Sequence, residues 1–126
     1  MADESIWTPQ DAIKLYEYES CDYLNLKIAK TCGLNRGKKV ENVAEAIGLP
    51  CIVGTELEPR VSSVAKIHLA PSMAIHPLAS EFTELTQLEG YILDNPIEII
   101  NGCVNLPTGP GFGVSINDEA LEKFKI

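Results

Sequence analysis

The chain of 126 residues is long enough for one domain with a modest core, and its 45% of hydrophobic residues excludes a disordered protein. The formal net charge of −8, without a cluster of basic residues, argues against nucleic-acid binding, because phosphates are bound by a face rich in Lys and Arg. Bound cations or a basic partner chain suit an acidic protein better.

The four cysteines are placed too irregularly for a zinc knuckle or a thioredoxin-like motif. They are Cys21, Cys32, Cys51 and Cys103, and none forms a C-x-x-C pair. We interpret them as reduced thiols in a cytoplasmic protein. The sequence has no apolar run of about 18 residues and no charged-then-apolar leader, so we expect neither a membrane segment nor a secretion signal.

The first predicted elements are a helix over residues 8–18 and a strand over residues 23–28. Thr8 can cap the helix, and Pro9 suits the first helical position because its φ angle is already helical. The stretch YLNLKI then alternates between apolar and polar residues, as a strand does. It ends in Lys27, an unusual residue at the end of a buried strand.

A second helix, a short strand and a third helix are predicted next. Apolar residues at helical spacing predict a helix from Leu34 to Ile47, which Gly48 and Pro50 end. The apolar residues 51–53 predict a short strand that runs into a glycine. Residues 61–69 predict the third helix.

The last third of the chain is rich in proline and glycine. Residues 82–85 (FTEL) predict a further, weaker strand, and LPTGPGFGV over residues 106–114 predicts an ordered loop or strap. A short terminal helix is predicted over residues 118–124, capped by Asn117 or Asp118. The alternation of helices and strands predicts an α/β fold with a parallel sheet.

Polar or ionisable residues recur where the predicted strands end. Asp3, Lys27, Thr55 and Glu84 follow one another at spacings of 24, 28 and 29 residues, about the length of one strand-plus-helix unit. The carboxyl ends of parallel strands meet at one edge of a sheet, where α/β proteins build their sites. Taken singly, Lys27 and Glu84 would be interpreted as solvated surface charges, and Asp3 as part of a frayed end.

Several motifs together resemble the carboxyl-terminal half of an enolase-superfamily barrel. They are, in order, MADES, YLNLKIAKTCGL, CIVGTELEP, FTEL and LPTGPGFGV. The most similar subgroup contains muconate lactonizing enzymes, dipeptide epimerases and succinylbenzoate synthases, and the resemblance covers essentially the whole chain. It implies the last part of a TIM-like (β/α)7β barrel, about strands 5/6 to 8, in residues 1–100, with a strap and short helix in residues 101–126.

The resemblance also implies a chemistry. Such enzymes abstract an α-proton beside a substrate carboxylate, and Mg2+ stabilises the resulting enediolate. Asp3 matches a metal ligand, Lys27 the acid/base lysine, with a pKa depressed by nearby cations, and Glu84 an acidic residue lining the substrate pocket. Residues expected to support the substrate and these groups are Glu4, Lys30, Thr55 and Glu58.

For Lys30 and Arg60, the sequence favours a position on the surface. Lys30 reads as a surface charge near the start of the second helix, although the family commonly carries a lysine there. Arg60 lies in a segment that is usually rich in Gly and Ala, and either holds a carboxylate or faces solvent, with solvent favoured.

The family's amino-terminal capping domain, its K-x-K motif and two further metal ligands find no match in this sequence. We therefore expect a fragment that is inactive alone: a truncated frame, a cloned piece or one half of a split protein. Open strand edges predict self-association or a complementing amino-terminal half. A small carboxylate is the expected substrate of the complete enzyme.

Two alternatives stay open. The chain is either part of a cycloisomerase, epimerase or lyase, or a chain with a vestigial barrel that serves as a non-catalytic α/β interaction module or is a truncated product without function. An independent flavodoxin-like fold is less favoured, because the glycine-rich segment near residue 110 does not join a strand to a helix.

Overall fold

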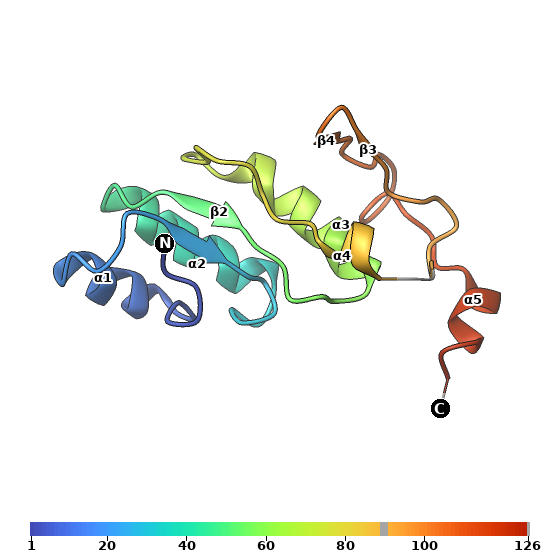
Figure 1. Cartoon of the computed structure of the whole chain (residues 1–126), viewed down its shortest axis with the longest axis horizontal. Coiled ribbons are helices and arrows are strands. Elements are labelled where there is room, and N and C mark those ends of the chain that lie inside the picture. The colour runs from blue at the N-terminus through green and yellow to red at the C-terminus, as the bar shows by residue number, and fades with distance from the viewer. Residues whose placement is uncertain (89–90, 126) are drawn as a thin grey trace.

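A computed structural model describes residues 1–88 and 91–125 of the chain (Figure 1). Figure 1 shows α1, β1, α2 and β2 together at one end and the carboxyl-terminal hairpin and α5 at the other. The elements in chain order are α1 (Pro9–Glu17), β1 (Leu24–Leu26), α2 (Leu34–Ala46), β2 (Cys51–Val53), α3 (Arg60–Leu69), the 3-10 turn η1 (Ala70–Ser72), α4 (Glu84–Gln87), β3 (Ile99–Ile100), β4 (Cys103–Val104) and α5 (Asp118–Glu122).

Helix α1 begins with a complete capping box. The Thr8 side chain accepts a hydrogen bond from the Asp11 amide at 3.3 Å, and the Asp11 carboxylate accepts one from the Thr8 amide at 2.8 Å. These bonds satisfy amides at the helix start that have no partner within the helix. The predicted start of the helix is confirmed.

Strands β1 and β2 pair in parallel, as the alternation of elements predicted. Asn25 lies opposite Ile52, flanked by the pairs Leu24–Cys51 and Leu26–Val53. Ala2 adds a parallel bridge on the other side of β1, because its amide donates to Tyr23 O at 2.8 Å and its carbonyl accepts from Asn25 N at 2.8 Å. The predicted strand over residues 23–28 is shortened to Leu24–Leu26, by one residue at its start and two at its end.

The hydrophobic core has two parts. The first lies between the β1–β2 pair and the helices around it, and includes Ile6, Ala12, Leu24, Leu26, Val40, Ala44, Cys51 and Val53. The second lies under α3 and contains Val64, Ile67, Leu85, Leu93 and Ile97. α1 and α2 pack on the first part, which fixes the carboxyl ends of β1 and β2 side by side.

The predicted strand over residues 82–85 is wrong. Leu85 N donates to Phe82 O and Gln87 N to Thr83 O, so the chain turns into the short helix α4. The turn places Leu85 in the second core. The chain instead runs beside β2 one step earlier, where Glu81 N donates to Val53 O at 2.8 Å.

Residues 106–114 form neither a helix nor a strand, in keeping with the predicted loop or strap. Asn117 caps α5 by accepting a hydrogen bond from the Ala120 amide at 2.8 Å, while α5 ends at Glu122, earlier than expected. Gly113 has a φ of +70°, and a Cβ there would lie 2.8 Å from Thr108 N, so glycine is required. The antiparallel hairpin β3–β4 spans the proposed domain boundary at residue 100, a division that stays a prediction.

The structure bears on the predictions made for the cysteines and for membrane segments. All four cysteines are free thiols, and Cys51 is buried. Within residues 1–88 and 91–125, no helix has the length and apolar character needed to span a bilayer.

Candidate functional site

Asp3, Lys27 and Lys30 meet beside the carboxyl end of β1. Asp3 follows the bridge residue Ala2, and Lys27 follows the last residue of β1. Lys27 Nζ lies 2.9 Å from Asp3 Oδ1, and Lys30 Nζ lies 2.6 Å from the same oxygen and 2.5 Å from Asp3 O. The predicted juxtaposition of Asp3 with Lys27 is present in the structure.

The interpretation of Lys30 as a surface charge is wrong. Lys30 is only 4% exposed, because the turn after β1, in which Thr31 N donates to Lys27 O, folds its side chain back onto Asp3. A buried ammonium requires a partner, and Asp3 supplies both a carboxylate and a main-chain oxygen. Glu4 adds longer contacts, 3.5 Å to Lys27 and 3.7 Å to Lys30, from a side chain that is largely exposed.

Asn25 bridges two carboxylates in the same place. Its Nδ2 donates to Asp3 Oδ2 at 3.2 Å and to Glu81 Oε2 at 3.0 Å. Asn25 is buried on β1 two residues before Lys27, a spacing that puts both side chains on one face of the strand. The stretch YLNLKI contains this spacing, with Asn25 two residues before Lys27, but sequence alone assigned no role to Asn25 or to Glu81.

The charges of Asp3 and Lys27 stabilise each other. Burial alone would raise the pKa of Asp3, but hydrogen bonds from Lys30 and Lys27 outweigh it and lower the pKa. Burial alone would lower the pKa of Lys27, but the hydrogen bonds and negative charges of Asp3 and Glu4 together outweigh burial and raise the pKa. The expected depression of the Lys27 pKa is therefore absent in this structure, in which carboxylates face the lysine.

Three other predicted site residues gather in a second cluster around Lys66. Lys66 Nζ lies 2.5 Å from Glu84 Oε1, 3.0 Å from Glu58 Oε2 and 3.1 Å from Thr55 Oγ1. Glu84 also accepts hydrogen bonds from Ser63 Oγ, at 2.6 Å, and from Thr55 Oγ1. Lys66, Ser63 and Glu84 are fully buried.

The sequence predicted Glu84 at a strand end beside Asp3 and Lys27, but its carboxylate lies in the cluster around Lys66 instead. The connected residues at the end of β1 form one cluster, the Asp3 group: Asp3, Lys27, Lys30 and Asn25. Among the residues that the structure describes, no hydrogen bond or ion pair joins Glu84 to the Asp3 group, whereas Glu81 accepts a hydrogen bond from Asn25. The cause is the turn at residues 82–85, which directs Glu84 towards α3. Lys66 was missed because a lysine within an amphipathic helix is most simply interpreted as a surface residue.

Arg60 does not face solvent, contrary to the favoured interpretation. It is 6% exposed and donates from Nη2 to Leu85 O at 3.2 Å and to Leu88 O at 2.7 Å. Its guanidinium also lies 3.5 Å from the centre of the Tyr91 ring. Arg60 thus anchors the end of α4 to the start of α3.

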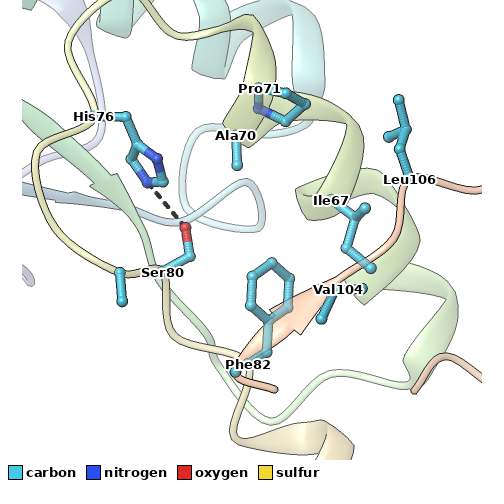
Figure 2. A pocket seen from close by; sticks show the side chains of 10 residues that line it. Ile67, Ala70, Pro71, His76, Ser80, Phe82, Val104 and Leu106 are labelled. Atoms are coloured by element: carbon cyan, nitrogen blue, oxygen red, sulfur yellow. Dashed lines mark hydrogen bonds between the residues drawn. The ribbon is translucent and has the colours of Figure 1, made fainter. Parts of the chain in front are cut away.

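An apolar cavity of about 380 Å3 lies on the other side of residues 80–82 (Figure 2). Ser80 and Phe82 line it, and Ser80 Oγ lies 3.0 Å from His76 Nε2. Glu81, between them, directs its carboxylate to Asn25 instead, as alternation along an extended chain requires. The cavity is therefore separate from the Asp3 group.

The side chains that could bind a metal ion are spread apart in the described part of the chain. Across residues 1–88 and 91–125, no group of three His, Cys, Asp or Glu side chains is placed to hold a metal ion. Both carboxylate oxygens of Asp3 already accept hydrogen bonds, Oδ1 from Lys30 and Oδ2 from Asn25. The described residues therefore do not form a Mg2+ site by themselves.

The chain belongs to the enolase C-terminal domain-like family, whose pattern matches residues 1–120. It is 34% identical to muconate cycloisomerase 1 of Rhodococcus opacus over 122 residues, which cover 97% of this chain and 33% of the relative. It is 33% identical over 120 residues to the L-Ala-D/L-Glu epimerase of Clostridium acetobutylicum, covering 90% of this chain and 32% of that enzyme.

Solved structures give the same result for the fold. The crystal structure of 2-chloromuconate cycloisomerase from Rhodococcus opacus 1CP matches with a TM-score of 0.93 and 32% identity over 100% of this chain and 34% of that chain. The resemblance to the muconate lactonizing subgroup of the enolase superfamily is thus confirmed. The chain spans about a third of the length of the relatives it matches.

Proposed function

We propose that this chain supplies the acid/base part of an enolase-superfamily active site that abstracts an α-proton from a small carboxylate substrate. The observation that carries the proposal is the 2.9 Å contact between Lys27 Nζ and Asp3 Oδ1 at the carboxyl end of paired parallel strands. A lysine held there can accept a proton once it is neutral and return it as an ammonium.

The other residues of the Asp3 group support that role. Lys30 donates to one oxygen of the Asp3 carboxylate, and Asn25 donates to the other and to Glu81. We assign to Glu81, rather than Glu84, the acidic position beside the substrate, because Glu81 alone of the two reaches the group. Ala2, β1, β2 and the segment at Glu81 would then be barrel strands five to eight.

Magnesium belongs to this proposal only with further ligands. When bound, Mg2+ would stabilise negative charge on the carboxylate of the deprotonated substrate. Asp3 is the one residue of the group that we assign to it, and the described residues do not complete the site. We propose that the missing carboxylates come from further barrel strands, in a complementing polypeptide or a second copy, and that the isolated chain is inactive.

The names of the relatives suggest two substrate classes. Muconate cycloisomerases and L-Ala-D/L-Glu epimerases match about equally well, so we propose a small carboxylate without choosing between a muconate and a dipeptide. The alternative is a non-catalytic α/β interaction module, in which the outer edges of this small sheet, at Ala2 beside β1 and at Glu81 beside β2, would pair with another chain.

Magnesium titration tests the proposal. Isothermal titration of the 126-residue chain should show millimolar or no binding, unchanged in Asp3→Asn. A hybrid in which this chain replaces its matching segment in the Bacillus subtilis L-Ala-D/L-Glu epimerase, to which it is 30% identical, should bind more tightly. Loss of that tighter binding in the Asp3→Asn hybrid supports the assignment, and unchanged binding contradicts it.

A further inference from the structure

The buried cluster around Lys66 has no part in the proposed chemistry, yet every ionic group in it is paired. The three Nζ protons of Lys66 face Glu84, Glu58 and Thr55, at 2.5, 3.0 and 3.1 Å. These partners come from the segment after β2 and from α4, while Lys66 lies on α3. One ammonium therefore joins three separate segments.

Two of the contacts of Lys66 fall on the turn that follows Glu81. Its Nζ lies 5.5 Å from the centre of the Phe82 ring, and it pairs with Glu84 two residues later. Glu84 is in turn held by Ser63 from α3 and by Thr55 from the end of β2. The turn is thus fixed from both sides.

Glu81 itself has only two polar anchors in the described structure. Its amide donates to Val53 O at 2.8 Å, and its carboxylate accepts from Asn25 Nδ2 at 3.0 Å. Glu81 is exposed, so water competes for both bonds. The orientation of this side chain then depends on how firmly the next three residues are held.

We propose that Lys66, through its pair with Glu84, is a positioning residue that holds Glu81 against the ends of β1 and β2. This inference rests on the function proposed for Glu81, but its structural part stands without any activity. A buried ion pair gives little net stability over an apolar pair, so its value lies in fixing one arrangement.

The test is residue-resolved amide exchange by NMR on the 126-residue chain, without metal or substrate. In Lys66→Met, exchange at Glu81 N–H should accelerate about 10- to 100-fold relative to Leu24 N–H, a core amide bonded to Pro50 O. The side-chain NH2 signals of Asn25 should shift as the contact with Glu81 is lost.

Two further variants keep the test decisive. The double variant Lys66→Met with Glu84→Leu removes the two fully buried charges and leaves Glu58, whose side chain is 14% exposed, as the one carboxylate without its ammonium. It should therefore fold even where the single variant does not, and should keep the fast exchange at Glu81. The matched control Lys38→Met breaks the Lys38–Glu41 pair of 2.5 Å, and should accelerate exchange at Ala74, which donates to Glu41, but not at Glu81.

Wild-type exchange at Glu81 and unchanged Asn25 signals in the double variant would overturn the proposal. Equal acceleration at Glu81 and Leu24 would also overturn it, since it would show a general loss of stability. Because the experiment uses no Mg2+, failure of the proposed function would appear in the magnesium titration and leave this result unaffected.

Discussion

The side chain of Asn25 occupies the space in which Gly54 would carry a Cβ. A Cβ built on Gly54 would lie 2.0 Å from Asn25 Oδ1 and 2.7 Å from its Cγ. Asn25 cannot bridge Asp3 and Glu81 in this position unless residue 54 is glycine. The glycine after β2 is therefore part of the geometry of the site.

Gly54→Ala should displace the Asn25 side chain and destabilise the chain by about 1–3 kcal/mol, the usual cost of overpacking a tight site. Urea unfolding followed by circular dichroism measures the change. In the Asn25→Ala background the same substitution should cost clearly less, because the clash is gone. Equal costs in the two backgrounds would show that Asn25 does not set the requirement for glycine.

Asp3→Asn should destabilise the chain because it leaves the buried Lys30 ammonium without its carboxylate. Asp3 is partly exposed, so solvent screens the pair and we expect about 1–2 kcal/mol rather than the larger cost of a fully buried pair. The measurement is the free energy of unfolding at pH 7 in low salt. Glu122→Gln, which breaks the exposed pair with Lys125, is the matched control and should change it little.

Acid should weaken the chain partly through Glu84. Burial alone would raise the pKa of Glu84, but hydrogen bonds from Lys66, Ser63 and Thr55 outweigh it and hold the pKa below the ordinary 4.5. A lowered pKa in the folded state stabilises above pH 4.5, and that contribution is lost as the pH falls through the folded-state pKa.

Glu84→Gln should therefore be less stable than the wild type at pH 7, by about 2–4 kcal/mol, with a difference that shrinks below pH 4.5. Urea unfolding between pH 3 and pH 7 checks this. A difference that does not change with pH would show that Glu84 contributes no ionised carboxylate to the fold.

The capping box of α1 predicts a smaller effect. Thr8→Ala removes the acceptor for Asp11 N and should cost about 1 kcal/mol, seen as a lower midpoint of urea unfolding. Thr8→Ser keeps the hydroxyl and should restore most of the loss. A Thr8→Ser variant as unstable as Thr8→Ala would refute the cap as the cause.

Local sequence rules predicted the parts of the fold that depend on local interactions. Thr8-Pro9 places the start of α1, and alternation around Asn25 and Lys27 places β1. The strand-end spacing brought Asp3 and Lys27 together, because parallel strands align their ends. These features need only the period of a strand or helix and one cap.

The residues that were missed depend on contacts between distant segments. Glu81 pairs with β2 through a single extended stretch whose sequence has no alternating pattern, whereas the neighbouring FTEL has the composition of a strand. Lys30, Arg60 and Lys66 are buried only because partners from other segments neutralise them or accept their hydrogen bonds. No pattern within their own helices or turns distinguishes them from surface residues.

The most direct test of Lys27 as the proton-transferring group is the exchange of the α-hydrogen of an L-Ala-D/L-Glu dipeptide with D2O, followed by NMR. The enzyme is the hybrid with the Bacillus subtilis epimerase, assayed with Mg2+. Lys27→Ala should reduce exchange at least about 1,000-fold, whereas Lys14→Ala, an exposed lysine of α1, should leave it unchanged. Exchange that persists at the parent rate in the Lys27→Ala hybrid would contradict the account.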